Sequence, residues 1–198
     1  MTAVPLDRSF FARPALTVAP ALVGMLLVRA DQGLLARIVE VEAYTQDDPA
    51  SHGYRGRTVR NSPLFGPPGH AYVYFTYGMH WCLNVATGED GIANGCLLRA
   101  AEPLEGLSLM QARRGNASRR DLLRGPARLA QAFELDGTWS GRDVCDGGPL
   151  HLADDGRRPP VVAGPRVGVA AAADHPWRFV IPESRWASPY KRSPRAPA

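Results

Sequence analysis

Glycine and proline interrupt this chain so often that long regular helices have little room in it. The sequence contains 20 glycines and 18 prolines among 198 residues, roughly a fifth of the chain against a usual share of about 12%. Glycine destabilises the interior of a helix and proline breaks it, so each one favours a turn or a boundary. We therefore expect short elements joined by many turns, which excludes a helical bundle.

The length and composition fit one globular domain. A chain of this size buries roughly 70% of the surface that its unfolded form exposes, enough for a core without a metal or a disulfide. Hydrophobic residues make up 45% of the sequence, which excludes a wholly disordered chain. Cys82, Cys96 and Cys145 are widely spaced and odd in number, so neither a disulfide framework nor a zinc site is indicated. With no basic and apolar leader, we expect a cytoplasmic protein.

The positive charge is carried almost wholly by arginine. The chain has 23 Lys and Arg against 19 Asp and Glu, a formal net charge of +4, and Lys191 is its only lysine. A modest basic excess favours a polyanionic partner such as nucleic acid, although many enzymes share it. Arginines crowd the expected helix ends between residues 113 and 128. We expect them, Arg128 included, to line a phosphate track; the alternative is a merely solvated surface.

Hydrophobic periodicity and turn residues define the expected elements. Helices are expected over residues 17–29, 103–113 and 126–135. Strands are expected over 34–44, 71–76, 81–87, 95–101, 150–153, 161–163, 167–170 and 179–181. Together they predict a mixed α+β fold with an antiparallel or mixed sheet, in one domain of residues 1–187. The basic, proline-rich residues 188–198 are expected to form a disordered tail.

Two carboxylates lie on one face of the expected strand 34–44. Successive side chains of a strand alternate between faces, which puts on one face Ile38, Glu40, Glu42 and Tyr44. Residues two apart on a strand are about 6.7 Å apart at Cα, so one carboxylate can be a base and the other structural. The simpler alternative is an edge strand with two solvated glutamates. A metal site with the histidines is a third, but no metal-ligand spacing is present.

The two strands around residues 71–87 predict a β-hairpin. Its turn contains Tyr77, Gly78 and Met79, with the glycine supplying a positive φ. A tyrosine at the tip of a two-stranded turn has nothing beneath it, so Tyr77 is expected to touch something external. A wedge inserted between base pairs from the minor groove is one use of such a side chain. The alternatives are a dimer contact or plain exposure.

Several motifs follow one another over most of the chain. They are RIVEVEAY at 37–44, ASH at 50–52, PPGHAYVY at 67–74, YGMHWCLN at 77–84 and LLRAAEPL at 97–104. GP at 125–126, RVGV at 166–169 and WRF at 177–179 come after them. In this order they resemble the alkyladenine (3-methyladenine) DNA glycosylase family, in particular a bacterial member, from about residue 9 to residue 187.

The resemblance implies both a fold and an activity. The fold is a single domain with a curved antiparallel sheet, peripheral helices and a protruding hairpin that intercalates into DNA. The activity is that of a monofunctional glycosylase in base excision repair, which flips an alkylated or deaminated purine out of duplex DNA and hydrolyses its N-glycosidic bond. The partner is damaged double-stranded DNA, no cofactor or metal is implied, and we expect a monomer. The preferred lesion stays open among 3-methyladenine, 7-methylguanine, hypoxanthine and ethenoadenine.

The resemblance also assigns the residues of the reaction and of the DNA contact. Glu42 would deprotonate the attacking water, and Arg99 would hold a phosphate near that water. Tyr77, supported by Met79, would fill the space that the flipped nucleotide leaves in the helix. Glycosylases that also nick the strand commonly use a lysine amine, and Lys191 lies in the expected tail. We therefore expect water as the nucleophile and no lyase activity.

Four further positions match the family's base-binding residues. Tyr44 would stack on one face of the flipped base, with His52 and Tyr74 on the other side. Asn84 matches the position that crowds the 2-amino group of guanine. The residue pattern alone leaves simpler alternatives open, because His52 could be a loop histidine bonded to backbone and Asn84 a strand amide that satisfies a neighbouring turn.

The residue pattern alone also leaves open other roles for Arg99 and other activities for the chain. Arg99 could simply form an ion pair with Glu40 or Glu102. A noncatalytic module that binds distorted duplex DNA would use the same hairpin and arginines. A metal-dependent nuclease or hydrolase would instead lose its activity to a chelator and cleave the strand directly.

Overall fold

Short helices and mostly short strands make up the chain, as its glycine and proline content predicts. A computed structural model describes residues 3–115, 117–145 and 147–197. Its strands are β1 (Val4–Pro5), β2 (Leu26–Arg29), β3 (Leu34–Tyr44), β4 (Ala71–Thr76), β5 (His80–Ala86), β6 (Gly95–Glu105), β7 (Leu150–Asp154), β8 (Val162–Gly164) and β9 (Arg178–Val180). Its α-helices are α1 (Arg8–Phe11), α2 (Ala15–Leu22), α3 (Leu107–Arg113) and α4 (Pro126–Ala132).

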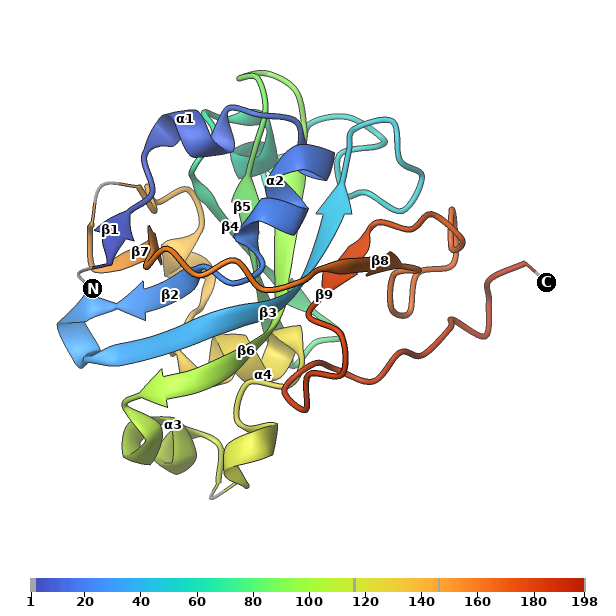
Figure 1. Cartoon of the computed structure of the whole chain (residues 1–198). Coiled ribbons are helices and arrows are strands. Elements are labelled where there is room, and N and C mark those ends of the chain that lie inside the picture. Colours follow the sequence, from blue (N-terminus) through green and yellow to red (C-terminus); the bar gives the residue numbers. More distant parts are fainter. Residues whose placement is uncertain (1–2, 116, 146, 198) are drawn as a thin grey trace.

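The strands form one curled antiparallel sheet. Its order is β1-β7-β2-β3-β6-β5-β4, and β9 joins it by pairing with β3 and with β8. In Figure 1, α1 and α2 lie toward the top of the sheet and α3 and α4 toward the bottom. The predicted α+β fold with a curved antiparallel sheet and peripheral helices is confirmed.

The core lies between the curled sheet and two of the helices. α2 packs against β3 and β6, and α4 packs against β5 and β6. Val18 and Leu22 of α2 and Leu129 and Phe133 near α4 are fully buried in one apolar cluster with Leu98 of β6. Because both helices bury their apolar sides in the same cluster, the sheet and helices form a single folded unit.

β3 occupies the centre of the sheet, and the parity of its core-facing residues changes along its length. It pairs with β2 at its start, with β9 near its end, and with β6 over most of its residues. In the β3–β6 pairing, Val39 of β3 and Arg99 of β6 have no cross-strand partner. Each strand therefore has an extra residue at this place, as in a β-bulge. Ile38 therefore packs in the main core with Val41. The prediction that Ile38 shares a face with Glu40 and Glu42 is wrong, because a bulge breaks the simple alternation.

Two predicted helix boundaries are also wrong. Residues 26–29 were expected to continue a helix but form β2, which pairs with β3 and β7. Gly24, with a φ of +97°, ends the helical conformation before them. Residues 103–105 belong to β6 rather than to a helix, and α3 begins only after Gly106, whose φ is +77°.

The remaining expectations hold with shifts of a few residues. Strands form within the expected ranges 34–44, 71–76 and 150–153, and α4 begins at Pro126 as the Gly-Pro pair predicts but ends at residue 132. Residues 167–170 were expected to form a strand and contain none. In the described part of the chain no helix is both long and apolar enough to cross a bilayer.

The predicted boundary between domain and tail falls next to a packed residue. Ser188 is buried, and its backbone N–H donates to a carboxylate oxygen of Glu40 over 2.6 Å. Farther along, the carbonyl of Lys191 accepts a hydrogen bond of 2.9 Å from the N–H of Gly168. Ser188 therefore packs against the folded domain, while the disorder of residues 189–197 stays a prediction and residue 198 lies outside the described residues.

An ion pair joins β3 to the residue that follows β7. The guanidinium of Arg37 donates to both carboxylate oxygens of Asp155 over 3.0 and 2.7 Å, and it also donates to the carbonyl of Gly24. Only 8% of the Arg37 side chain and 16% of the Asp155 side chain are exposed. Paired hydrogen bonds of this kind are stronger than single ones.

We predict that Asp155→Asn lowers the free energy of unfolding by about 3 kcal/mol at neutral pH, because it leaves a buried guanidinium without its carboxylate. Hydrogen bonds from Arg37 lower the pKa of Asp155 from 3.8 to about 2. A lowered pKa stabilises the folded state above pH 3.8, and that stabilisation disappears as the pH falls toward about 2. The difference between wild type and variant should narrow over this window in urea unfolding.

The neighbouring Asp154→Asn is the matched control for this variant. Its carboxylate pairs with Arg158, whose side chain is 62% exposed, so the expected loss is less than about 1 kcal/mol. Equal losses of unfolding free energy in Asp155→Asn and Asp154→Asn would contradict the expectation that the buried ion pair contributes more than the exposed one.

Candidate functional site

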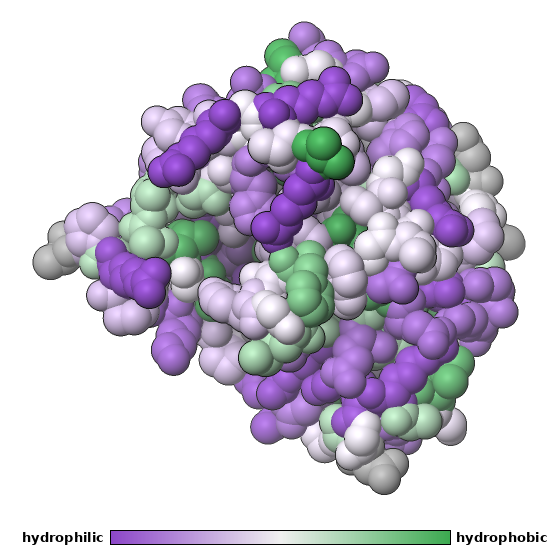
Figure 2. Space-filling view, turned by 180° about the vertical axis from the view of Figure 1, so that it is seen from behind, coloured by the Kyte–Doolittle hydropathy of each residue, from purple (hydrophilic) through white to green (hydrophobic). Residues whose placement is uncertain are grey.

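A cavity of about 410 Å³ opens beside the β4–β5 hairpin. The end of β3, the start of β6, the N-terminus of α4 and residues 167–169 also reach it. Figure 2 shows that the face opposite to the view of Figure 1 is hollowed, with hydrophobic residues beside the hollow and hydrophilic ones around it. The cavity brings together the four residues predicted to bind a base, which are Tyr44, His52, Tyr74 and Asn84. Tyr72 and Arg99 line it as well. Concave sites with aromatic walls and few polar groups are typical of ligand binding.

One wall of the cavity is a cluster of aromatic rings. The rings of His52 and Tyr74 meet edge to face with centroids 4.5 Å apart, and Tyr72 stacks on Tyr74 at 5.4 Å. Nδ1 of His52 shares a hydrogen bond of 3.0 Å with the Tyr72 hydroxyl, so the alternative of a backbone-bonded histidine is wrong. Burial lowers the pKa of His52, helped by the charge of Arg60, and raises that of Tyr72 to about 12. Both rings are therefore held uncharged near neutral pH.

The side-chain amide of Asn84 lies on the same strand pair. Its Nδ2 donates to the carbonyl of Tyr72 over 3.3 Å, and the residue is buried against the cavity. The cross-strand register pairs Tyr72 with Asn84. The amide is thus anchored within the hairpin strands, rather than in a neighbouring turn as the simpler alternative held, and it lines the cavity.

Tyr44 faces the cavity with a cation behind its ring. The guanidinium carbon of Arg166 lies 4.6 Å from the ring centroid of Tyr44 and 5.1 Å from that of Trp177. Arg166 is fully buried in an ion pair with Asp48, and it also donates to the carbonyl of Ala43 over 3.1 Å. This support fixes the plane of the tyrosine. Sequence reasoning assigned no role to Arg166 or Asp48; the only signal was that Arg166 opens the RVGV motif.

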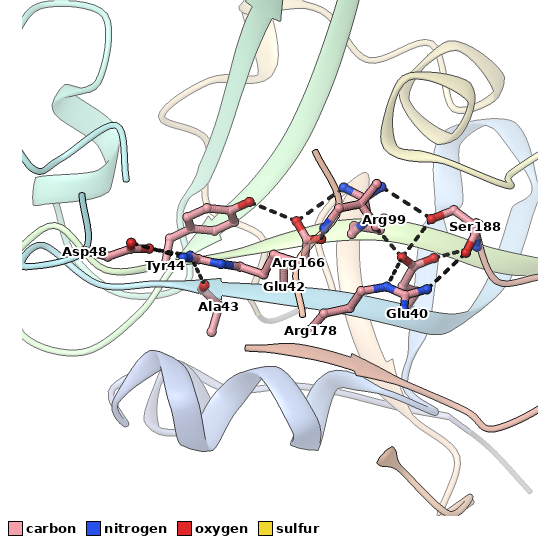
Figure 3. Close-up of polar contacts among 10 residues, drawn as sticks. Glu40, Glu42, Ala43, Tyr44, Asp48, Arg99, Arg166, Arg178 and Ser188 are labelled. Atoms are coloured by element: carbon pink, nitrogen blue, oxygen red, sulfur yellow. Dashed lines mark hydrogen bonds and ion pairs between the residues drawn. The ribbon is translucent and has the colours of Figure 1, made fainter. Parts of the chain in front are cut away.

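The carboxylate of Glu42 lies directly behind the cavity wall. One oxygen accepts from the backbone N–H of Val167 over 2.7 Å, and the other accepts from the Tyr44 hydroxyl over 2.9 Å and from Arg99 over 3.3 Å. Glu42 itself is fully buried, but each of these three donors lines the cavity. Burial, with the charge of Glu42, raises the pKa of Tyr44 well above its ordinary value. Tyr44 is therefore a neutral donor to an adjacent carboxylate (Figure 3).

Glu40 lies two residues before Glu42 on β3 and belongs to a second polar cluster. Its oxygens accept from Nε of Arg99 over 2.9 Å, from Nε of Arg178 over 2.8 Å, and from both the N–H and the hydroxyl of Ser188 over 2.6 and 2.8 Å. Burial alone would raise the pKa of Glu40, but the charges of Arg99 and Arg178 outweigh it and the pKa is lowered. The alternative of two solvated glutamates on an edge strand is wrong, because both are buried on the central strand.

Arg99 bridges the two carboxylates. Its Nε contacts Glu40, one terminal nitrogen contacts Glu42, and the other contacts the Ser188 hydroxyl over 3.3 Å. Burial would lower the pKa of Arg99, but the two glutamates raise it. The alternative of an ion pair with Glu40 is confirmed, and the phosphate contact of Arg99 stays a prediction. Sequence reasoning assigned no role to Arg178 or Ser188, since both come from distant segments; the signal for Arg178 was its place in the WRF motif at 177–179.

The tip of the hairpin presents two apolar side chains to solvent. Tyr77 is 87% exposed and Met79 is 66% exposed. The N–H of Met79 donates to the carbonyl of Thr76 over 3.2 Å, and Tyr77 and Gly78 have φ values of 52° and 67°. Positive φ at both central positions is typical of a type I′ turn. For a tyrosine this conformation is strained by about 1 kcal/mol, and such strain clusters at functional sites.

The hairpin is held from its other side. Phe75 and Trp81, which alternate with the cavity-facing residues, pack together with centroids 4.8 Å apart. The Trp81 ring in turn lies against Gly137, where a Cβ atom would come within 3.1 Å of it. This packing explains how a two-stranded turn holds Tyr77 away from the body of the protein.

Most arginines between residues 113 and 128 contact groups of the protein itself. Arg113 pairs with Glu134 over 2.6 Å, and Arg124 donates to the carbonyl of Ala187 over 2.7 Å. Arg128 is half exposed and lies 3.2 Å from Asp121. Two residues away from it, Pro126 lines the cavity. The predicted phosphate track therefore has few free guanidinium groups at this place, and the DNA contact of Arg128 stays a prediction.

The histidines that could have formed a metal site are not gathered at one place. His52 and His80 line the cavity, whereas Nδ1 of His70 lies 3.0 Å from the carbonyl of Pro67. Over residues 3–115, 117–145 and 147–197, no group of three or more His, Cys, Asp and Glu side chains is placed to hold a metal ion.

Comparison with known proteins gives a consistent picture. The model of the methylpurine-DNA glycosylase family matches residues 9–185. A protein of Burkholderia lata is 51% identical over 92% of this chain and 90% of its own length. One of Streptomyces avermitilis is 51% identical over 94% and 92%, and one of Carboxydothermus hydrogenoformans 46% over 92% and 98%. All three carry a provisional name as a 3-methyladenine DNA glycosylase. Because the family match covers nearly the whole chain, the protein belongs to the methylpurine-DNA glycosylase family.

Proposed function

We propose that this protein is a monofunctional DNA glycosylase of base excision repair, which hydrolyses the N-glycosidic bond of damaged purines in duplex DNA. The observation that carries this proposal is the place of Glu42, whose carboxylate lies behind an aromatic cavity and accepts hydrogen bonds from three groups that line it. Family membership supports a glycosylase, and the cavity supplies the chemistry. A monomeric, cytoplasmic protein remains our prediction.

The cavity fits a flipped nucleobase. A base that leaves the helix needs a pocket that replaces its stacking and reads its edge. Tyr44 offers one flat face, and the rings of His52 and Tyr74 offer a second side, in a cavity of about 410 Å³. The Asn84 amide, which also lines the cavity, would meet the edge of the base, where it would crowd a 2-amino group such as that of guanine.

Glu42 would act as the general base. A water bound beside its oxygens would give a proton to the carboxylate while its own oxygen forms a bond to C1′ of the deoxyribose. The bond from C1′ to the purine nitrogen breaks at the same time, and the electron pair leaves with the purine. Arg99, 3.3 Å from Glu42, would orient the carboxylate and contribute positive charge close to the DNA backbone. The product is an abasic site in an intact strand.

The hairpin would hold the helix open. Tyr77 and Met79 project from its tip, next to the cavity that Tyr77 and His80 also line. A side chain wedged between base steps replaces the stacking that the flipped nucleotide loses. The strained conformation of Tyr77 supports a role at the tip, since nothing in the fold itself requires a bulky residue there.

A second group of arginines lies near the cavity mouth. Arg55 and Arg57 are exposed on the segment between β3 and β4, close to His52 and Ser51 of the cavity wall. Within the described residues neither forms a hydrogen bond or an ion pair, in contrast to the arginines near α4. We infer that these two guanidinium groups contact phosphates of the bound duplex.

The first test replaces the general base. Glu42→Gln should lower single-turnover excision of 3-methyladenine or hypoxanthine by at least about 100-fold, because the proton acceptor is lost. Binding to the same duplex should persist. The abasic product of the wild-type enzyme should be cleaved only after alkali, with no protein trapped on DNA by borohydride. Glu105→Gln, at the exposed end of β6, is the control and should excise normally.

Three outcomes of this test would contradict parts of the proposal. Retained excision by Glu42→Gln would remove Glu42 from the mechanism. A wild-type protein that binds lesions but releases no base would instead be the noncatalytic binder. Trapping through Lys191 would overturn the monofunctional assignment.

The second test concerns the wedge. Tyr77→Gly removes the side chain and also relieves the positive φ, so the free energy of unfolding should rise slightly or stay the same, by up to about 1 kcal/mol. Excision from a matched duplex should fall, whereas excision from a single strand, where the base is already unstacked, should change little. Equal losses on both substrates would show that Tyr77 does not open the helix.

The third test measures salt dependence. The double variant Arg55→Ala/Arg57→Ala should flatten the slope of log affinity against log salt by about two, and Arg128→Ala by about one, because each phosphate contact releases about one counterion. Arg157→Ala, a 70% exposed arginine beside Asp155, is the control and should leave the slope unchanged. A slope that stays the same in the double variant would contradict the phosphate contacts.

A further inference from the structure

We propose that Glu40 is a positioning residue, which holds Arg99 so that only one of its guanidinium nitrogens reaches the carboxylate of Glu42. The inference rests on the proposed function, in which Glu42 activates the attacking water. It assigns a task to the carboxylate for which the sequence predicted only a structural or an unspecified role.

The contacts of Glu40 leave it no freedom to move. One oxygen accepts three hydrogen bonds, from Arg99, Arg178 and the Ser188 hydroxyl, and the other accepts the backbone N–H of Ser188 over 2.6 Å. A carboxylate can accept about four hydrogen bonds, and Glu40 accepts four. The donors come from β6, from β9 and from the segment after residue 187. Three separate parts of the chain therefore fix Glu40.

This anchoring determines which part of Arg99 faces Glu42. Nε of Arg99 is held by Glu40 at 2.9 Å and one terminal nitrogen is held by Ser188 at 3.3 Å. Only the other terminal nitrogen remains for Glu42, at 3.3 Å. An unconstrained arginine would approach a carboxylate with two parallel hydrogen bonds of about 2.7–2.9 Å. The single, longer contact leaves the oxygens of Glu42 able to accept a hydrogen bond from water.

Loss of the charge at position 40 would change that balance. Arg99 would be free to turn and to close on Glu42 with two nitrogens. The carboxylate would then be a weaker base with less room for water. The charged and titratable groups that face Glu42 are Arg99 of β6, Tyr44 and Glu40 of its own strand, Arg178 of β9, and Tyr74 of β4. Arg178 also loses its contact with Glu40, but its terminal nitrogen still donates to the carbonyl of Ser188 over 3.0 Å. Arg99 is therefore the cation that we expect to move, because it already contacts Glu42.

Stability does not explain the cluster. Replacing buried ion pairs by apolar residues of similar volume is often neutral or stabilising, and the apolar side chains of Val39 and Trp186 already lie beside it. A second buried ion pair of β3, that of Arg37 and Asp155, has a single carboxylate for its guanidinium. Arg99 differs in having two, and the second one is the proposed base.

The experiment compares Glu40→Gln with wild type on a lesion duplex. We expect single-turnover excision to fall by about 100-fold, as for a reacting group displaced by about 1 Å, while the dissociation constant for the duplex changes by less than about twofold. The acid limb of the pH–rate profile should move to lower pH, because a closer guanidinium and the loss of a like charge both lower the pKa of Glu42.

A second variant separates positioning from charge. Ser188→Ala removes the hydroxyl that contacts both Arg99 and Glu40 but changes no charge. It should lower excision by a smaller factor, about tenfold, and move the acid limb in the same direction. Asp155→Asn is the control for the loss of a buried ion pair from β3, and should leave the rate and the profile of the folded protein unchanged.

A titration followed by carboxyl ¹³C NMR measures how these variants change the environment of Glu42 without requiring catalysis. The midpoint of Glu42 should fall in Glu40→Gln and in Ser188→Ala, whether or not the protein excises a base, so this measurement tests the positioning separately from the proposed function. An unchanged midpoint in both variants, or wild-type excision by folded Glu40→Gln, would overturn the inference. Absence of excision by the wild-type protein would overturn the proposed function instead.

Discussion

One buried guanidinium, that of Arg99, organises the chemistry of the cavity. It lies between Glu40 and Glu42, and Arg178 supplies the second positive charge, so four ionised groups form a cluster with no net formal charge. Water is largely excluded from them, and isolated charges there would cost far too much free energy. The lowered pKa of Glu40, despite its burial, reflects how strongly the arginines favour the ionised form. The cluster keeps a carboxylate charged at a place where burial alone would neutralise it.

The irregularity of the central strands puts this cluster beside the cavity. In a regular strand that buries Leu34 and Ile38, the later residues of the same parity would also point into the core. The register passes over Val39 and Arg99 at the same level, and beyond it Val41 enters the core instead. The acidic residues therefore turn away from the apolar cluster. A bulge in each strand is thus the local feature by which a core strand also carries the carboxylate that we propose as the general base.

Local patterns predicted the parts of the fold that depend on neighbouring residues. The strand 34–44, the turn at Gly78 and the helix start at Pro126 follow from alternation, from positive φ and from the missing proline N–H. The apolar residues of 34–44 change parity between Ile38 and Val41, so the bulge had a signal that simple alternation overlooked. Residues 26–29 look helical in isolation and become a strand only because β3 and β7 lie on either side. The partners of Glu40, from residues 178 and 188, are contacts between distant segments that no local pattern records.

The walls of the cavity limit how the departing base can be helped. Burial keeps the pKa of Tyr44 and Tyr74 raised and that of His52 lowered, so these rings are neutral around pH 7. The Tyr44 hydroxyl already donates to Glu42, and the Tyr72 hydroxyl shares its hydrogen bond with His52. Neutral aromatic faces attract a cationic ring through their quadrupoles, and an alkylated purine that carries a positive charge leaves without protonation. A neutral damaged base needs a proton in order to leave, and these rings carry no positive charge from which to donate one. For the proposed glycosylase reaction, we therefore expect these neutral walls to favour purines that already carry their leaving-group charge.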